Sequence, residues 1–121
     1  MNTDEITERI GAAFAVSNSL GTGFLEKVYE NALAYELRQM GLKVEQQKPI
    51  AVHYRGVVVG DYVADLLVEG CVLVDLKAVK GLDDSHLAQC LNYLKATGLR
   101  HALLLNFGTS KVQVKRVVHG F

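Results

Sequence analysis

The first forty residues carry hydrophobic side chains at the three- and four-residue spacing of amphipathic helices. Over residues 4–19 one stripe contains Ile6, Ile10, Ala13, Phe14 and Ser17. Over residues 24–40 a second, broader face contains Leu25, Val28, Tyr29, Ala32, Leu33, Leu37 and Met40. Glycines at positions 21 and 23 follow the first segment and Gly41 follows the second, as is typical of helix ends. The pattern predicts two N-terminal helices.

From residue 44 onward the pattern changes to the alternation of β-strands. We predict strands over residues 44–54, 57–68, 71–79, 101–107 and 111–118, with a helix over residues 84–97. The helix is introduced by Asp83-Asp84-Ser85 and closed by Gly98. Pro49 indicates an edge strand or a bulge, because proline cannot donate a ladder hydrogen bond. The order of two helices, three strands, a helix and two strands predicts one α/β domain over residues 1–121.

Two charged residues interrupt the most hydrophobic of these strands. Asp75 and Lys77 lie within the run CVLVDLKAV, which otherwise reads as a buried strand. Side chains two positions apart share a face of a strand, so these two point the same way, roughly 6–7 Å apart. A third charged residue, Asp65, stands ten positions before Asp75 on the preceding strand. Buried charges of this kind either pair or take part in chemistry.

The loop between these two strands decides whether Asp65 joins the other two residues. A two-residue loop, Glu69-Gly70, would pair Asp65 with Val74 and send its carboxylate to the opposite face. A three-residue loop that also includes Cys71 would pair Asp65 with Asp75. A shared site therefore requires an odd-numbered loop or a bulge of equal effect.

Two neighbouring carboxylates repel each other unless a proton or a cation lies between them. Magnesium and similar hard cations take carboxylate and water oxygens, usually with few protein ligands. With a lysine on the same face, such a site could attack a phosphodiester. The alternative is an Asp75–Lys77 ion pair at a strand edge with Asp65 facing solvent, because an isolated D-x-K pattern is common by chance.

Further polar residues accompany these three. Glu26 is expected at the rim of the second helix's apolar face, with Glu30 pointing further out, and Glu26 could instead serve only the helix dipole. Gln89 and Tyr93 lie one turn apart on the helix over residues 84–97, where ordinary hydrogen bonding would also explain them. His86 is expected to be an exposed helix residue rather than a catalytic one.

Composition adds few constraints. The 13 Lys and Arg residues balance the 13 Asp and Glu residues, so any surface that binds phosphate must be local. We expect no membrane span and no signal segment. The two cysteines, Cys71 and Cys90, cannot form a disulfide framework, and a reduced, cytoplasmic setting is expected. The GTG at residues 21–23 lacks the strand and the acid of a dinucleotide-binding motif, which argues against a doubly wound small-molecule enzyme.

The motifs resemble those of a known group. Residues 23–29, GFLEKVY, match the G-x-x-E-x-x-Y signature of the GxxExxY proteins, a group placed in the PD-(D/E)XK nuclease superfamily. The resemblance of this chain to the group covers roughly residues 5–118. The superfamily's motifs follow in order: Asp65, then the D-x-K of Asp75 and Lys77, then Q-x-x-x-Y at Gln89 and Tyr93. Asp75 stands where the superfamily more often has glutamate, and Ala64 stands where it more often has proline.

The resemblance implies a restriction-endonuclease-like α/β fold with a central mixed β-sheet flanked by helices. It implies Asp65, Asp75 and Glu26 as metal ligands, with Glu26 also holding the attacking water. Lys77 would activate that water, Gln89 would fix the substrate or a neighbouring group, and Tyr93 would be more structural. The expected activity is Mg- or Mn-dependent cleavage of DNA or RNA. The alternative is a catalytically silent module with the same fold that binds a protein or nucleic-acid partner, possibly as a homo-oligomer.

Overall fold

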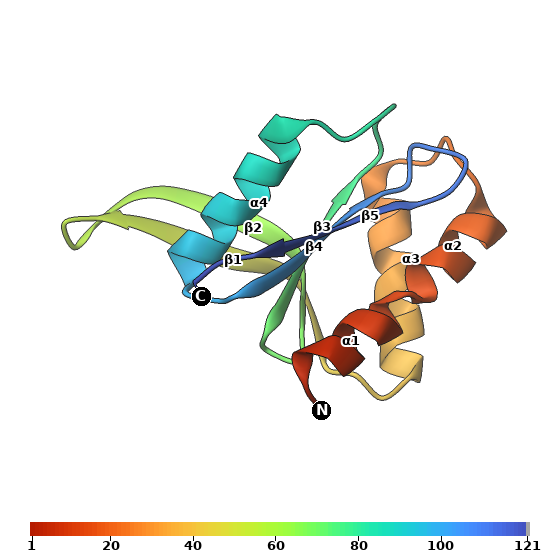
Figure 1. The fold of residues 1–121 in the computed structure, drawn as a ribbon, viewed down its shortest axis with the longest axis horizontal. Helices are drawn as coiled ribbons and strands as arrows, with labels where there is room; N and C mark the ends of the chain where they lie inside the picture. Colours follow the sequence, from red (N-terminus) through yellow and green to blue (C-terminus); the bar gives the residue numbers. More distant parts are fainter. Residues whose placement is uncertain (121) are drawn as a thin grey trace.

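Five strands form one mixed sheet in the order β1-β2-β3-β4-β5 in the computed structural model, which describes residues 1–120 (Figure 1). The strands are β1 (Val44–Tyr54), β2 (Val57–Val68), β3 (Val72–Lys77), β4 (His101–Asn106) and β5 (Gln113–Val118). β3 and β4 run parallel, whereas β1–β2, β2–β3 and β4–β5 are antiparallel pairs. Pro49 lies on the edge strand β1, as the sequence predicts.

Helices cover both faces of the sheet (Figure 1). Helices α1 (Thr3–Ile10), α2 (Ala12–Leu20) and α3 (Glu26–Gln39) pack on one face, and α4 (Asp84–Thr97) packs on the other. Alternate residues of β3 serve the two sides, so Val74 packs towards α3 whereas Leu73 packs towards α4. The expected mixed sheet flanked by helices is confirmed, and its two cores are separate clusters.

The first predicted helix is divided in two. Residues 4–19 were expected to form one helix, but α1 ends at Ile10 and α2 begins at Ala12. Gly11 between them has its N–H bonded to the Glu8 carbonyl, and a Cβ at this position would lie 2.8 Å from the same oxygen. The break therefore occurs where the chain turns too tightly for any side chain.

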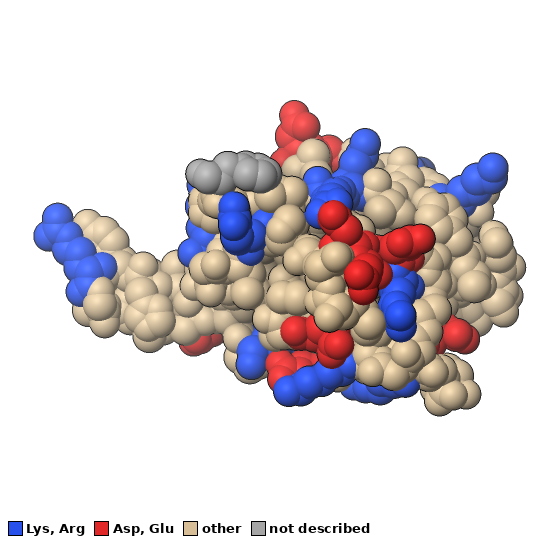
Figure 2. All heavy atoms as spheres, turned by 60° about the horizontal axis from the view of Figure 1, so that its bottom comes forward, with Lys and Arg blue, Asp and Glu red and all other residues tan. Residues whose placement is uncertain are grey.

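A long two-stranded arm projects from the sheet. β2 pairs with β3 only at Leu66–Val68, so the ribbon formed by residues 48–63 of β1 and β2 continues beyond the other strands (Figure 1). We call these residues the arm. Figure 2 shows the arm as a mostly uncharged projection with a basic side chain at its end. Ile50, at the base of the arm, packs into the core beneath α4.

No helix among the described residues is both long and apolar enough to cross a bilayer.

Candidate functional site

The hairpin between β2 and β3 has the three-residue loop that a shared site requires. The ladder pairs Val68 with Val72, Leu67 with Leu73 and Leu66 with Val74, which leaves residues 69–71 as the loop. The same register, continued by one position, places Asp65 opposite Asp75. Glu69 and Gly70 both have positive φ, 53° and 68°, and glycine adopts this conformation most easily. Of the two loop lengths that the sequence left open, the structure has the three-residue loop, and the two aspartates share the face that α4 covers.

Asp65 holds the two strands together where they separate. Its Oδ2 accepts a hydrogen bond of 2.7 Å from the backbone N–H of Leu76. The backbone ladder ends one residue earlier, at the Leu66–Val74 pair, so the side chain replaces the next ladder bond. This bond fixes the Asp65 carboxylate beside Asp75 at the point where the two strands separate.

Asp75 is a buried carboxyl without a hydrogen-bond partner on one oxygen. The residue is 6% exposed, and its Oδ2 is enclosed with no partner among the described residues. Lys77 Nζ lies 3.9 Å from that oxygen, too far for a hydrogen bond. Burial raises the pKa of Asp75 to about 7, Lys77 opposes this rise, and Asp65 and Glu26 add to it. The effect of burial is larger than that of Lys77, because the free energy lost in desolvating the carboxylate exceeds its attraction to an ammonium group 3.9 Å away.

Lys77 is held by the helix that covers it. Its Nζ donates a 2.9 Å hydrogen bond to Gln89 Oε1 on α4. The D-x-K of β3 and the glutamine of the Q-x-x-x-Y pattern therefore meet. Tyr93, one turn further along α4, is nearly buried, and its pKa is raised to about 12 by burial first and then by the charges of Asp75 and Asp65.

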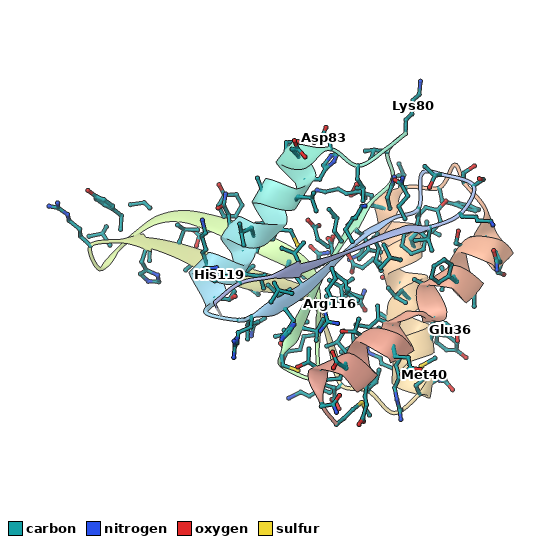
Figure 3. The ribbon with its side chains drawn as sticks, viewed as in Figure 1. Glu36, Met40, Lys80, Asp83, Arg116 and His119 are labelled. Carbon is teal, nitrogen blue, oxygen red and sulfur yellow. The ribbon has the colours of Figure 1, made fainter. Side chains whose placement is uncertain are left out.

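The start of α4 is fixed by a reciprocal cap. Asp83 accepts hydrogen bonds from the N–H groups of Ser85 and His86, while His86 Nδ1 accepts from the Asp83 N–H. This arrangement satisfies donors that a helix start leaves unpaired. Figure 3 shows Asp83 at this end of α4, with Lys80 extending from the preceding connection. His86 thus has a structural role in orienting the helix that carries Gln89.

Glu26 is the third acid that the sequence proposes for the site. It is the first residue of α3 and its side chain is exposed, although its charge contributes to the raised pKa of Asp75. No group of three His, Cys, Asp or Glu side chains within residues 1–120 is placed to hold a metal ion. The structure brings together Asp65, Asp75, Lys77 and Gln89, and leaves Glu26 near their edge.

Glu30, not Glu26, is the buried acid of α3. The expectation that Glu30 points outward is wrong, because it is only 3% exposed. Its carboxylate accepts hydrogen bonds from Lys27 Nζ at 3.0 Å, from Gln46 Nε2 at 2.7 Å and from the Gln47 amide. The predicted face included Leu25, which is 81% exposed. The helix is therefore rotated towards β1, whose two adjacent glutamines satisfy the buried charge.

The aspartate pair fits a hard divalent cation. Asp75 offers a buried oxygen that has no partner among the described residues. In Asp65, Oδ2 accepts from the Leu76 N–H, which leaves Oδ1 to bind a cation. Magnesium is commonly held by only one or two carboxylates, with water and substrate oxygens completing the shell. Two carboxylates therefore match the number that magnesium commonly takes from a protein.

The sequence analysis missed Asn106, which fixes the chain as it leaves β3. Asn106 is fully buried at the end of β4. Its Oδ1 accepts from the N–H groups of Val79 and Gly108, and its Nδ2 donates to the Val79 carbonyl and to Gln113 Oε1. Gly108 is required here, because a Cβ would lie 2.1 Å from the Val79 carbonyl oxygen. The available signal was a polar residue that ends an apolar strand two positions before a glycine.

Comparisons with known proteins agree with this arrangement. The crystal structure of SSO0001 has a TM-score of 0.61 at 16% identity, covering 79% of this chain and 51% of that one. The chain thus spans about half the length of SSO0001. The crystal structure of the alkaline exonuclease LHK-Exo from Laribacter hongkongensis has a TM-score of 0.55 at 12% identity, covering 98% of this chain and 83% of that one. The predicted restriction-endonuclease-like fold is confirmed by these likenesses.

The search of curated proteins found no match. The model of the PD-(D/E)XK nuclease superfamily matches residues 3–117, which is nearly the whole chain. The matched range includes Asp65, Asp75, Lys77 and Gln89, which the β2–β3 register and α4 bring to one face of the sheet. The chain therefore belongs to the PD-(D/E)XK nuclease superfamily.

Proposed function

We propose that this protein hydrolyses phosphodiester bonds of DNA or RNA with the help of Mg²⁺ or Mn²⁺. The observation that carries the proposal is the unpaired buried oxygen of Asp75, which faces Lys77 and lies beside the anchored carboxylate of Asp65. A protein rarely keeps such an oxygen without a proton or a cation.

The residues of the site have separate roles in this proposal. Asp65 and Asp75 would hold the cation, which would supply positive charge to the phosphate and lower the pKa of water. Lys77 would donate a hydrogen bond to the phosphate oxygen as charge develops there. Gln89 would keep the Lys77 ammonium directed into the site. Water forms the new bond to phosphorus, the bridging P–O bond breaks, and the leaving oxygen takes up a proton.

We further propose that the chain is a GxxExxY protein, because each motif residue has a physical role at the start of α3. Gly23 has a φ of 105°, which disfavours any other residue. Tyr29 donates a 2.6 Å hydrogen bond from its hydroxyl to the Gly21 carbonyl, and its ring stacks on Phe107 at 4.7 Å. Tyr29 thus anchors the turn that places Glu26 beside the site. Glu26 would join the cation or its water once a cation is bound.

The test is a cleavage assay with single-stranded and duplex DNA and RNA in Mg²⁺, in Mn²⁺ and in EDTA. We expect cation-dependent cleavage that Asp75→Ala and Lys77→Ala abolish. Lys43→Ala is the matched control, because Lys43 is exposed and remote from the aspartate pair in the chain. Absence of cleavage of all four substrates by the wild type in either cation would refute the proposal.

A second candidate function is a catalytically silent binding module. The observation that favours it is the absence of a three-residue metal-binding group within residues 1–120. Cation binding distinguishes the two functions: a nuclease should bind Mn²⁺ through Asp65, whereas a silent module should show the same calorimetric titration before and after Asp65→Asn. The asparagine keeps an oxygen for the Leu76 N–H, so the change tests the charge and not the fold.

A further inference from the structure

A groove opens beside the aspartate pair, between the arm and α4. Its volume is about 690 Å³, and its walls come from Val52, His53 and Tyr62 of the arm and from one face of α4. Gln89 and Tyr93 belong both to this wall and to the surroundings of the site. The groove and the proposed phosphate site are therefore adjacent.

The groove has an aromatic wall. The rings of Tyr62 and Tyr93 lie 5.6 Å apart at an angle of 52°, so Tyr93 supports the Tyr62 ring from within. Tyr93 is 9% exposed whereas Tyr62 is 50% exposed. The Tyr62 ring is thus held by the protein while a large part of it stays open to a ligand. Aromatic rings presented in this way are the usual stacking platforms for nucleobases.

The rest of the lining suits a nucleotide. Asn92 and His53 offer hydrogen-bond donors and acceptors, and both are exposed. Lys95 adds a positive charge, and no Asp or Glu is among the described residues that line the groove. Its volume is that of a small-ligand site, about 300–1,000 Å³ in proteins, and not that of a groove for a double helix.

We propose that this groove binds an unpaired nucleobase of the substrate, stacked on Tyr62, while the attached phosphate lies at Asp65 and Asp75. The inference rests on the proposed function and adds the substrate class: single-stranded or unpaired nucleic acid rather than intact duplex. In a duplex each base face is covered by its neighbours, so only an unpaired base can offer a face to Tyr62.

The chain offers a direct optical test, because it contains no tryptophan. The Tyr62→Trp variant would place its single tryptophan in the groove. The matched control is Tyr54→Trp, because Tyr54 is an exposed arm tyrosine that does not line the groove. The probes are a thymidine decamer, an abasic decamer with the same phosphates, and a blunt duplex, all in EDTA.

We expect the thymidine decamer to quench the fluorescence of Tyr62→Trp, and the abasic decamer and the duplex to leave it nearly unchanged. Tyr54→Trp should respond weakly and equally to all three probes. Equal responses of Tyr62→Trp to the thymidine and abasic decamers would overturn the proposal, because they would report phosphate contacts alone.

Cleavage separates this proposal from the proposed function. Tyr62→Ala should slow cleavage of single strands by about ten- to a hundredfold, and Tyr54→Ala should leave it unchanged. A wild type that cleaves single strands while Tyr62→Ala cleaves them equally fast would overturn the groove proposal and retain the nuclease. A wild type that cleaves nothing would refute the nuclease, and the quenching experiment would still decide whether a base occupies the groove.

Discussion

At the scale of single residues, Asp75 would serve the proposed chemistry as a carboxylate, but its ionisation lowers the stability of the folded protein. Its folded-state pKa of about 7 lies above the ordinary value of 3.8. The folded protein therefore binds this proton more tightly than the unfolded chain does, and the stability it contributes is lost progressively as pH rises from about 3.8 through about 7. A cation would remove this penalty by compensating the charge.

We predict that Asp75→Asn stabilises the protein at pH 8, because a neutral amide replaces a buried carboxylate. The gain in the free energy of unfolding should be roughly 1–4 kcal/mol at pH 8. It should be clearly smaller at pH 5, where the folded carboxyl is protonated, and it should vanish only below about pH 4, where the unfolded chain is protonated as well. Urea unfolding at both pH values, in EDTA, measures this. A gain that is equal at pH 5 and pH 8 would show that Asp75 is not the titrating group.

Lys77 is predicted to matter for its position and not only for its charge. Lys77→Ala should reduce cleavage by at least about a hundredfold, because it removes a donor aimed at the developing charge on phosphate. Lys80→Ala is the matched control: Lys80 is an exposed lysine three residues away that extends from the chain into solvent (Figure 3). Single-turnover cleavage rates measure both. Equal losses in the two variants would indicate a general electrostatic effect.

At the scale of secondary-structure elements, the site depends on how β3 ends. Asn106 on β4 bonds to both the N–H and the carbonyl of Val79, two residues beyond Lys77. We predict that Asn106→Ala lowers the free energy of unfolding by about 2–4 kcal/mol, because it leaves the N–H groups of Val79 and Gly108 without their partner. Chemical denaturation measures this.

The control for this prediction is Asn18→Ala, because Asn18 is an exposed residue of α2. Its substitution should change the free energy of unfolding by less than about 0.5 kcal/mol. An effect of Asn106→Ala as small as that of Asn18→Ala would contradict the role assigned to the buried amide.

The elements also show what the sequence can and cannot predict. Strand alternation and the glycine in the loop limited the partner of Asp65 to Val74 or Asp75, because register is a local property of hairpin length. The sequence did not decide between a two-residue and a three-residue loop, and the structure has the three-residue loop. The rotation of α3 was not predictable, because it depends on Gln46 and Gln47 of β1, which satisfy Glu30 from a distant part of the chain. Asn106 was missed for the same reason, since its partners lie at residues 79, 108 and 113.

At the scale of the whole molecule, the site and the groove arise from one departure from regular structure. β2 pairs with β3 only over Leu66–Val68, and the part of β2 that precedes Leu66 runs with β1 as the arm, alongside α4. The separation leaves space between the arm and α4, and this space is the groove beside the covered aspartate pair. Because an isolated two-stranded ribbon is only marginally stable, the contact of Tyr62 with Tyr93 serves both to support the arm and to shape the groove.

Cation binding should therefore stabilise the whole domain and do so more strongly at higher pH. A cation at one hundred times its dissociation constant adds about 2.7 kcal/mol to the free energy of unfolding. We predict a rise in melting temperature of about 10 °C in saturating Mn²⁺ at pH 8. The rise should shrink below pH 7, because the cation must then displace the proton of Asp75, whose pKa is about 7. Differential scanning calorimetry measures it, with Asp65→Asn expected to lose the response and Asp61→Asn, an exposed aspartate of the arm, expected to retain it. A melting temperature that Mn²⁺ raises equally in both variants would place the cation elsewhere on the molecule.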